Sequence, residues 1–407
     1  MAGTLKTLFR RVFPKSNRKH ISVIEETQSI NDIPLNKNEQ DSNGSFIQRT
    51  ISFKKKKKSV NKQESDRLLS KRDLLNIFGK RFNLNSMFSQ KYCPVEFLGD
   101  GSFGFVMMCE RVSDKKRCAV KFILKSKVSP TSWIVDDDDV VPFEVYLLKR
   151  LDHPNIVKFL DYFEDTKYIY LVTELHGTQW SLLNPKLNPH QNPGLRNHER
   201  MHHSCNNLLT FVPSDPQLQN EALILNKQAE KLNISSQTSF DLFECIDAHY
   251  RLPEFAVKKI FKQILSAVQY LNALQIVHRD LKDENIVVDE NYDIKIIDFG
   301  SAAYLPFDEM FDQFNGTMQF ASPEILLENQ FNGTCAEVWT LGVLLYTMLF
   351  NENPFYDQSH IIAAKLDPPL KVSESPTSPM HLVRQLLEPN WKKRIGLFDI
   401  QNHQWLQ

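Results

Sequence analysis

The order of apolar and polar positions divides the chain into segments of different character. Apolar, β-branched runs separated by turn residues predict an antiparallel meander, and they are YCPVEFLGD, GFVMMCERV and RCAVKFIL. Helical spacing follows in VPFEVYLLKRL, two further strand-like runs extend to about 176, and long helical patterns dominate from 253 onward. We therefore expect a small β-rich unit over 92–176 and a larger helical unit over 240–407.

A long polar stretch, 177–239, interrupts this pattern and is rich in Asn, Pro, His and Ser. Because a structureless stretch of this length is unusual inside a domain, we interpret it as an inserted loop. It contains His198, His202 and His203, but no cysteine or carboxylate shares their spacing. A His-rich loop is therefore favoured over a metal site.

The composition of residues 1–91 predicts a basic, mostly disordered tail. Within 1–15, apolar residues recur at helical spacing and basic residues lie mostly off that stripe. Such a helix could lie on an acidic membrane, contact an import receptor as a mitochondrial presequence, or dock on the body of the protein. Five lysines at 54–58 could bind acidic lipid, nucleic acid or an import receptor, or simply remain solvated. Since no aromatic residues interleave with them, we expect no specific nucleic-acid partner.

The overall composition is that of a folded protein. Apolar residues make up 42% and charged residues 24% of the 407 residues, which excludes a wholly disordered or fibrous chain. The net charge is zero, but residues 1–82 contain 19 Lys and Arg against 8 Asp and Glu, so the remainder is acidic. The longest apolar run, 342–350, is about half the length of a membrane-spanning helix, so we expect no such helix.

The six cysteines lie far apart and include no CxxC pair. They predict neither a disulfide framework nor a zinc cluster, and they favour a reducing compartment. We expect a cytoplasmic monomer, with a nuclear, membrane-associated or mitochondrial location left open.

The segment GDGSFGFV contains Gly99, Gly101 and Gly104 before Val106. Glycine lets a backbone approach phosphate groups closely, and the flanking strand pattern predicts a β-hairpin flap. Glycine hairpins without ligands are common, so this motif alone decides nothing.

A lysine and two acids downstream have the character of a phosphate-binding set. Lys121 lies in an apolar strand, where a lysine is costly unless it is paired, and Glu144 in the next helical segment is a suitable partner. Asp298 follows a buried strand and begins the sequence Asp-Phe-Gly. Lys121 can hold the α- and β-phosphates of a nucleotide while Glu144 fixes it, and Asp298 offers oxygen ligands to Mg²⁺.

The segment HRDLKDEN, 278–285, lies between a long amphipathic helical pattern and an apolar strand. Asp280 can orient a hydroxyl group or accept its proton, and Lys282 can neutralise a moving phosphoryl group. Asn285 is a second oxygen ligand for Mg²⁺. Each residue has an ordinary structural explanation alone, but their order and spacing together predict phosphoryl transfer.

These strings resemble the eukaryotic protein kinase family, and KDEN, DFGSAAY, EVWTLG and ENPF resemble PAS-domain kinases of the calmodulin- and AMP-activated branch. The resemblance implies an α+β, two-lobed fold, with 92–176 as the N-lobe and hinge and 240–407 as the C-lobe. It implies ATP contacts at Leu98, Gly99, Gly101, Gly104, Val106, Ala119, Lys121, Thr173, Glu174, His176, Asn285, Val287 and Asp298. The usual Asp of D-x-W-S-x-G is Glu337 here. Residues 1–91 are too few and too polar for a PAS module, so we expect none there.

The resemblance also bears on the substrate. Lys282 and the pair Gly316–Thr317 are similar to those of serine/threonine kinases, and Thr317 would lie in the peptide-docking segment. Asp241 and Glu284 fall where kinases that favour basic substrates place acids, so we expect basic residues before the phosphoacceptor. Arg394 matches the arginine that pairs with Glu324 of the A-P-E motif. A pseudokinase scaffold and a small-molecule kinase are the alternatives.

The segment after Asp-Phe-Gly contains no Ser, Thr or Tyr between 305 and 315. Many kinases phosphorylate this segment, and the phosphate pairs with the arginine of H-R-D, which is Arg279 here. We predict activity without such a phosphate. Either the carboxylates of this segment engage Arg279, or its apolar residues hold it by packing alone. The carboxylates are Asp308, Glu309 and Asp312, and the apolar residues are Phe307, Met310, Phe311 and Phe314.

Overall fold

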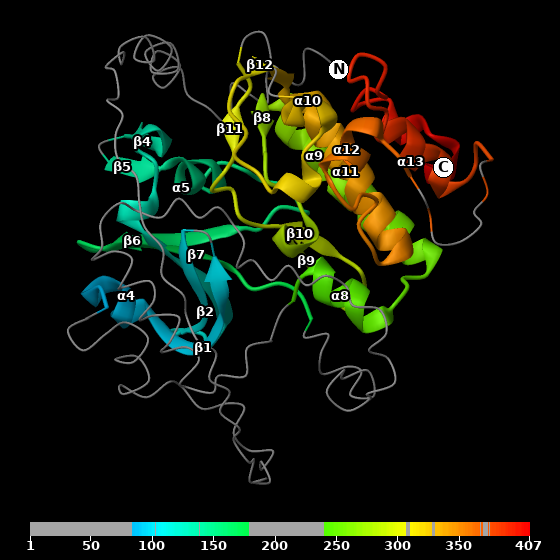
Figure 1. Cartoon of the computed structure of the whole chain (residues 1–407). Coiled ribbons are helices and arrows are strands. Elements are labelled where there is room, and N and C mark those ends of the chain that lie inside the picture. Colours follow the sequence, from blue (N-terminus) through cyan, green and yellow to red (C-terminus); the bar gives the residue numbers. More distant parts are fainter. Residues whose placement is uncertain are drawn as a thin grey trace, which may run out of the picture.

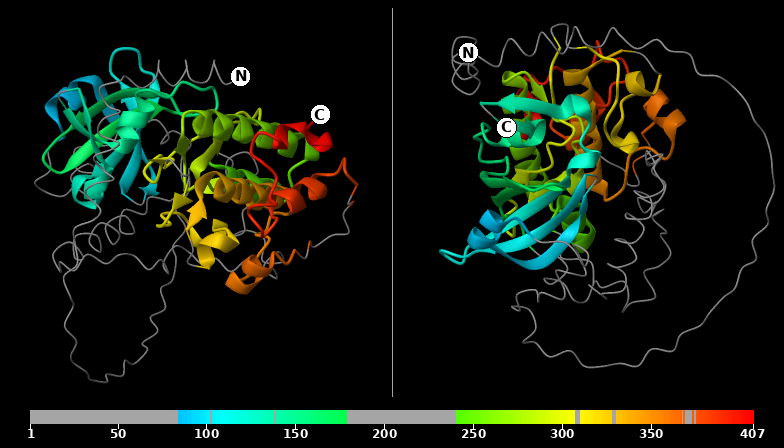
Figure 2. Two further views of the ribbon diagram at one scale, coloured as in Figure 1. Left: turned by 90° about the horizontal axis from the view of Figure 1, so that it is seen from above. Right: turned by 90° about the vertical axis from the view of Figure 1, so that its left-hand side faces the viewer.

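The structure, a computed structural model, describes residues 84–101, 103–137, 139–178, 240–306, 310–327, 330–366, 368, 373 and 375–407. The predicted tail features at 1–15 and 54–58, and nearly all of the predicted insert, lie outside the described residues. The described chain forms a small lobe around a sheet and a larger lobe of helices (Figure 1, Figure 2).

An antiparallel sheet of five strands, in the order β1-β2-β3-β7-β6, forms the small lobe. The strands are β1 (Tyr92–Gly101), β2 (Gly104–Arg111), β3 (Arg117–Leu124), β6 (Phe159–Glu164) and β7 (Tyr168–Glu174). Alternation along β3 buries Cys118, Val120 and Phe122 in an aromatic cluster on one face. Ala119 and Lys121 consequently lie on the opposite face, which meets the helical lobe.

A short helix, α4 (Ser86–Lys91), covers the aromatic face of this sheet. Phe88 is fully buried, and its ring centroid lies 4.9 Å from that of Tyr170. Asn85 caps the helix by accepting a hydrogen bond from the amide of Phe88. The packed chain thus begins before residue 92. The sequence did not indicate this helix, because a single phenylalanine in a polar segment gives no periodic signal.

A small hairpin and one short helix lie between β3 and β6. They are β4 (Trp133–Asp136), β5 (Asp139–Pro142) and α5 (Phe143–Leu148). Helical spacing predicted this helix over 141–151, and the structure confirms it in shortened form. The first two residues of that range belong to β5, because Val141 pairs with Ile134 in the hairpin.

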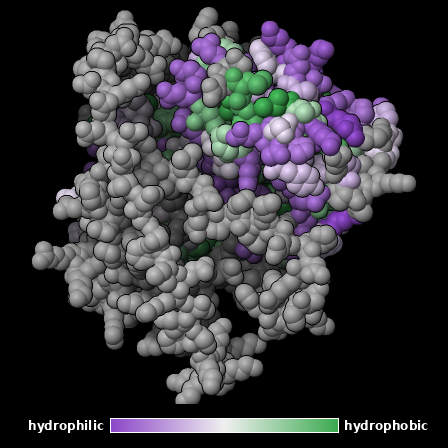
Figure 3. Space-filling model, in the orientation of Figure 1, coloured by the Kyte–Doolittle hydropathy of each residue, from purple (hydrophilic) through white to green (hydrophobic). Residues whose placement is uncertain are grey.

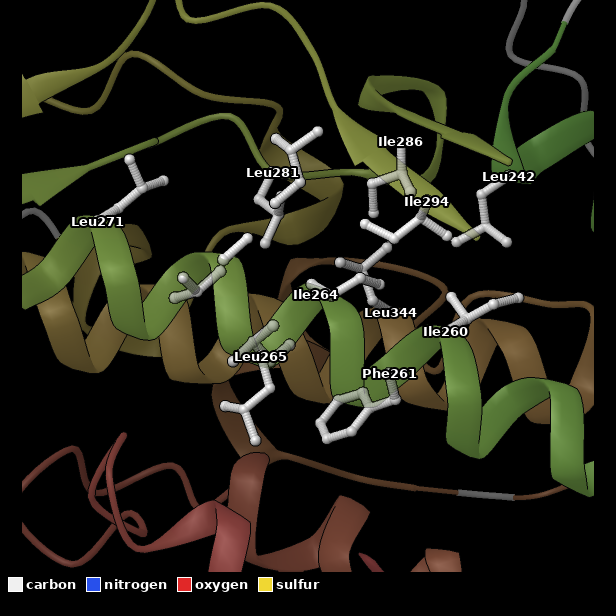
Figure 4. Close-up of a cluster of buried hydrophobic side chains, with 14 of the residues drawn as sticks. Leu242, Ile260, Phe261, Ile264, Leu265, Leu271, Leu281, Ile286, Ile294 and Leu344 are labelled. Atoms are coloured by element: carbon white, nitrogen blue, oxygen red, sulfur yellow. The ribbon is translucent and has the colours of Figure 1, made fainter. Parts of the chain in front are cut away.

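The large lobe is built on two long helices. Its helices are α8 (Leu242–His249), α9 (Glu254–Ala273), α10 (Pro323–Leu326), α11 (Gly333–Phe350), α12 (Gln358–Ala363) and α13 (Pro379–Leu386). Apolar residues of α9 recur at helical spacing and are buried, as its sequence predicted. Figure 4 shows Ile260 and Ile264 of α9 directed toward Leu344 of α11 and Ile294 of a small strand pair.

Short strand pairs carry the loops that follow α9. Their strands are β8 (Ile276–Val277), β9 (Ile286–Val288), β10 (Ile294–Ile296), β11 (Ala303–Tyr304), β12 (Met310–Phe311) and β13 (Phe331–Asn332). The pairs are β9 with β10, β8 with β11, and β12 with β13. These pairs hold the loops against a rigid helical core, which positions the polar residues that the loops contain.

Among the described residues, α11 is the one helix that is long and apolar enough to cross a membrane by length and composition. However, 72% of this helix, Gly333–Phe350, is buried inside the protein, as expected for the central helix of a core. At the surface, Figure 3 shows hydrophobic residues gathered in the upper part of the large lobe. The exposed apolar residues of this lobe include Leu327, after α10, and Ile362, in α12.

The predicted pairing of Arg394 with Glu324 is confirmed. The guanidinium donates two hydrogen bonds to the carboxylate, with lengths of 2.7 and 2.9 Å, and both side chains are buried. This pair fastens α10 to the segment that follows α13.

Candidate active site

A largely buried lysine lies between two carboxylates where the lobes meet. The Nζ atom of Lys121 lies 2.7 and 2.9 Å from the two carboxylate oxygens of Glu144, in α5. It also lies 2.7 Å from Oδ1 of Asp298, which comes from the large lobe. The structure therefore brings together the three residues that the sequence predicted as a phosphate- and metal-binding set.

Electrostatics at this position favour a charged lysine. Burial alone would lower the pKa of Lys121, but the carboxylates of Asp298 and Glu144 outweigh it and raise that pKa above its ordinary value. Burial acts in the opposite direction on Asp298 and would raise the pKa of this acid, but the Lys121 ammonium outweighs burial and lowers that pKa. For Glu144 burial dominates, and its pKa is raised. One ammonium thus faces two acids, an arrangement that can accept a further cation beside Asp298.

The backbone is strained at two of the predicted functional positions, next to Asp280 and at Asp298. Arg279 and Asp298 have φ angles of 65° and 60°, in the left-handed region that residues with a side chain rarely adopt. The buried carboxylate of Glu337 accepts hydrogen bonds from the backbone amides of His278 and Arg279, and so holds the first of these turns. Burial raises the pKa of Glu337 to about 7. Glu337, where the resemblance implies an aspartate, therefore fixes the backbone of the 278–285 segment at His278 and Arg279.

Asp280 accepts four hydrogen bonds, from Thr317 and Asn285. Its Oδ1 atom accepts from the amide and the hydroxyl of Thr317, at 3.0 and 2.8 Å. The Nδ2 atom of Asn285 donates to the Asp280 backbone carbonyl at 2.8 Å and lies 3.3 Å from its Oδ2. The ammonium of Lys282 lies 4.0 Å from the same Oδ2. Thr317, Asn285 and Lys282 therefore converge on the Asp280 carboxylate, which already accepts a hydrogen bond from a hydroxyl group.

The glycine-rich hairpin joins β1 to β2 and lies close against β3 at Gly104. A Cβ atom added to Gly104 would lie 1.8 Å from the carbonyl oxygen of Phe122, so glycine is required where the strands approach. Gly99 has open space around it, and Gly101 pairs with Gly104 at the end of the hairpin. The space beside Gly99 is consistent with a ligand that approaches the backbone there.

The residues predicted to surround adenine lie on adjacent strands. Val106 is opposite Lys121 on β3, and Ala119 is opposite Thr173 on β7. The polar side chains of the predicted hinge contact the large lobe, because Glu174 forms an ion pair with Lys295 at 2.8 Å and His176 contacts the Asp293 carbonyl at 2.8 Å. Leu98 lies on β1 and Val287 on β9, and both are half-buried.

The acids predicted to recognise substrate lie beside the catalytic loop. Asp241 caps α8 and forms an isolated β-bridge with Val287. Glu284 is half-exposed, and its carboxylate lies 2.7 Å from the Lys282 ammonium. Asp283, beside them, is buried, and burial together with the charges of Glu284 and Asp241 raises its pKa to about 7. Burial thus favours the neutral form of Asp283, which leaves Asp241 and Glu284 as the acids available to a basic ligand.

A model of the protein kinase domain family matches residues 92–208 and 225–406. The chain belongs to the protein kinase domain family. The match also confirms the α+β, two-lobed fold that the motifs predicted.

Three relatives illustrate the branch of this kinase domain. It is 34% identical over 320 residues to the PAS domain-containing serine/threonine-protein kinase of Mus musculus, covering 78% of this chain and 19% of the relative. It is 30% identical over 321 residues to the serine/threonine-protein kinase PSK1 of Saccharomyces cerevisiae, and the match covers 77% of this chain and 19% of that relative. It is also 30% identical over 336 residues to the serine/threonine-protein kinase pim-2 of Danio rerio, and this match covers 80% of this chain and 88% of that relative. The chain thus spans about a fifth of the length of the first two relatives.

One residue that lies at the site of this kinase domain, Phe103, was not identified from the sequence. Phe103, at the tip of the glycine-rich hairpin, has its ring centroid 5.8 Å from Nζ of Lys121. A Cβ atom added to Gly300 would lie 2.7 Å from the same ring. An aromatic residue between glycines was the available signal, and its inward direction depends on tertiary packing that periodicity does not show.

The donors near Asp298 fit a hard divalent cation. Asp298 and Asn285 supply carboxylate and amide oxygens, which are the ligands that Mg²⁺ prefers. In the part of the chain that the structure describes, no group of three or more His, Cys, Asp or Glu side chains could hold a metal alone. Mg²⁺ is usually bound by one or two carboxylates together with waters and substrate phosphates, and Asp298 and Asn285 fit that ligand set.

Proposed function

We propose that this chain is an ATP-dependent serine/threonine protein kinase, which transfers the γ-phosphoryl group to Ser and Thr hydroxyls of protein substrates. The contact that carries this proposal is the position of Lys121, 2.7 Å from both Glu144 and Asp298. This arrangement requires α5 and the Asp-Phe-Gly segment to be in place together, as phosphoryl transfer by kinases demands. Membership of the kinase domain family supports the same conclusion.

Each side chain has a role that follows from its contacts. Lys121 would bind the nucleotide phosphates, and Glu144 keeps its ammonium in place. Asp298 and Asn285 would hold Mg²⁺, which when bound neutralises phosphate charge. Asp280 would orient the substrate hydroxyl, since its Oδ1 already accepts from the Thr317 hydroxyl. Lys282 supplies positive charge within 4.0 Å of that carboxylate.

The test is transfer of label from γ-labelled ATP to a generic basic peptide containing serine. The wild-type chain should label the peptide, and Asp298→Ala should not, because it loses an oxygen ligand for the metal and a partner of Lys121. A pseudokinase would label nothing, and a small-molecule kinase would leave the peptide unlabelled while consuming ATP with a small acceptor.

Basic substrates are proposed from two acids beside the 278–285 segment, Asp241 at the start of α8 and the exposed Glu284. A substrate arginine would form charge-assisted hydrogen bonds there, each worth about 1.5–3 kcal/mol. Glu284→Gln is therefore expected to reduce the preference for Arg three residues before the phosphoacceptor about ten- to a hundredfold. A peptide library read with both proteins measures this, and Asp399→Asn, at an exposed acid of the same lobe, is the control. An unchanged preference would refute the role of Glu284.

Activity without phosphorylation of the 305–315 segment is also proposed, now through packing. The guanidinium carbon of Arg279 lies 5.4 Å from the ring centroid of Phe311, and its Nε donates to the Ser301 carbonyl at 2.6 Å. Phe311 in turn stacks on Phe331, with centroids 5.8 Å apart. Asp312 is exposed, while Phe307, Asp308 and Glu309 lie outside the described residues. The contacts of Arg279 with Phe311 and Ser301 support the packing alternative.

Phosphatase-treated protein is therefore expected to retain most of its activity, because the contacts of Arg279 involve a carbonyl and an aromatic ring. Initial rates before and after treatment measure this, with mass spectrometry to confirm that phosphate is absent. Phe311→Ser should lower the rate, and Asp312→Asn, at the next position, should not. A loss of more than tenfold on dephosphorylation would contradict the proposal.

A further inference from the structure

The helix that carries Glu144 is too short to hold its own position. α5 contains six residues, and its N-terminal cap, Pro142, makes no side-chain capping hydrogen bond. Isolated helices shorter than about 12–15 residues are marginal in water, so this one depends on contacts from other segments. Its position decides whether Glu144 reaches Lys121.

The β4–β5 hairpin provides such a contact at the C-terminal end of α5. Asp136 ends β4, and its side chain is 1% exposed. One carboxylate oxygen accepts from the Lys149 ammonium at 2.6 Å, and the other accepts from Nη2 of Arg150. Burial opposes ionisation of Asp136, but the hydrogen bonds from Arg150 and Lys149 outweigh it and lower the pKa of this carboxyl. A charged, buried acid thus clamps the two residues that follow the helix.

The clamp continues into the helix. The Arg150 guanidinium carbon lies 3.9 Å from the ring centroid of Tyr146, and Nη1 donates to the Tyr146 carbonyl at 3.1 Å. The ring of Phe143, at the first position of α5, packs edge-on against Tyr304 with centroids 5.1 Å apart. Tyr304 is itself paired with Ile276 in the large lobe. The helix is therefore held at both ends, by the hairpin and by the segment after Asp-Phe-Gly.

We propose that Asp136 is a positioning residue for the Lys121–Glu144 ion pair, and that the β4–β5 hairpin is a built-in brace for α5. By holding Lys149 and Arg150, Asp136 fixes the end of the helix and keeps the Glu144 carboxylate within reach of Lys121. The activity readout rests on the proposed kinase function. The brace itself can be measured without phosphoryl transfer.

The test compares Asp136→Asn in two backgrounds, wild type and Glu144→Gln. Asparagine keeps the shape of the side chain and removes the charge that Lys149 and Arg150 require. In the wild type, kcat/KM for peptide should fall about tenfold, a size typical of coupling between two sites. In Glu144→Gln the same change should cost less than twofold, because the brace then has no ion pair to position. Equal losses in both backgrounds would overturn the proposal, since they would indicate a merely structural role.

A second measurement does not depend on catalysis. Hydrogen exchange of the α5 amides should accelerate about tenfold in Asp136→Asn, and unchanged exchange there would overturn the brace. The matched control is Asp114→Asn, which removes the same charge from an exposed pair with Arg111 in the same lobe and should leave both readouts unchanged. If Asp136→Asn does not fold, Lys149→Gln removes one of the two cations and should give smaller changes in the same direction. A wild-type chain that transfers no phosphate would defeat the proposed function, yet the exchange result would still decide on the brace.

Discussion

Asp280→Asn is expected to lower kcat about 100- to 10,000-fold, the usual contribution of a positioned acid–base group. The KM for ATP should change little, because the Asp280 carboxylate is held mainly by Thr317, of the predicted peptide-docking segment, and asparagine can keep the contact with Asn285. Asparagine can still accept the hydrogen bond from Thr317, so the loop should keep its structure. Steady-state kinetics with a serine peptide measure both parameters.

The control for this variant is Asp399→Asn, an exposed acid of the large lobe, which should retain wild-type kinetics. Circular dichroism should show that both variants are folded. A loss of less than tenfold in Asp280→Asn would mean that this carboxylate does not act on the hydroxyl group.

Arg394→Met is expected to cost about 3–5 kcal/mol of unfolding free energy, because it leaves the buried carboxylate of Glu324 without its partner. The same guanidinium donates to the carbonyls of Cys335 and Glu388, so three acceptors would lose their donor. Urea unfolding measures the change.

The comparison variant is Lys91→Met, which removes an ion pair with Asp161 whose side chains are 54% and 27% exposed. Pairs of this kind contribute about 0–1 kcal/mol, so its unfolding free energy should stay close to that of the wild type. Similar losses in the two variants would show that burial of the Arg394–Glu324 pair has no special weight.

The sequence predicted most of the reacting groups because their spacing is itself informative. Lys121 and Glu144 are 23 residues apart, yet the strand and helix that carry them could each be identified locally. The long helix α9 was equally visible, because a wide apolar stripe over twenty residues gives a strong period. Order along the chain thus identified the lobes and the groups that meet between them.

Features that depend on long-range packing were not visible. The run of four aspartates at 136–139 gave no indication that its first member is buried against Lys149 and Arg150. Arg279 was expected to meet either a carboxylate or a packed apolar segment, and only the fold places Phe311 beneath it. Short elements such as α4 and α5 have too few residues for periodicity to define their ends.

The most direct measurement is phosphoamino-acid analysis after the chain alone is incubated with labelled ATP, Mg²⁺ and matched peptides containing Ser, Thr or Tyr. The proposed function predicts label on serine and threonine, none on tyrosine, and none on any peptide with Asp280→Asn. Label on tyrosine at a comparable rate, no label from the wild type, or equal label from Asp280→Asn would contradict it.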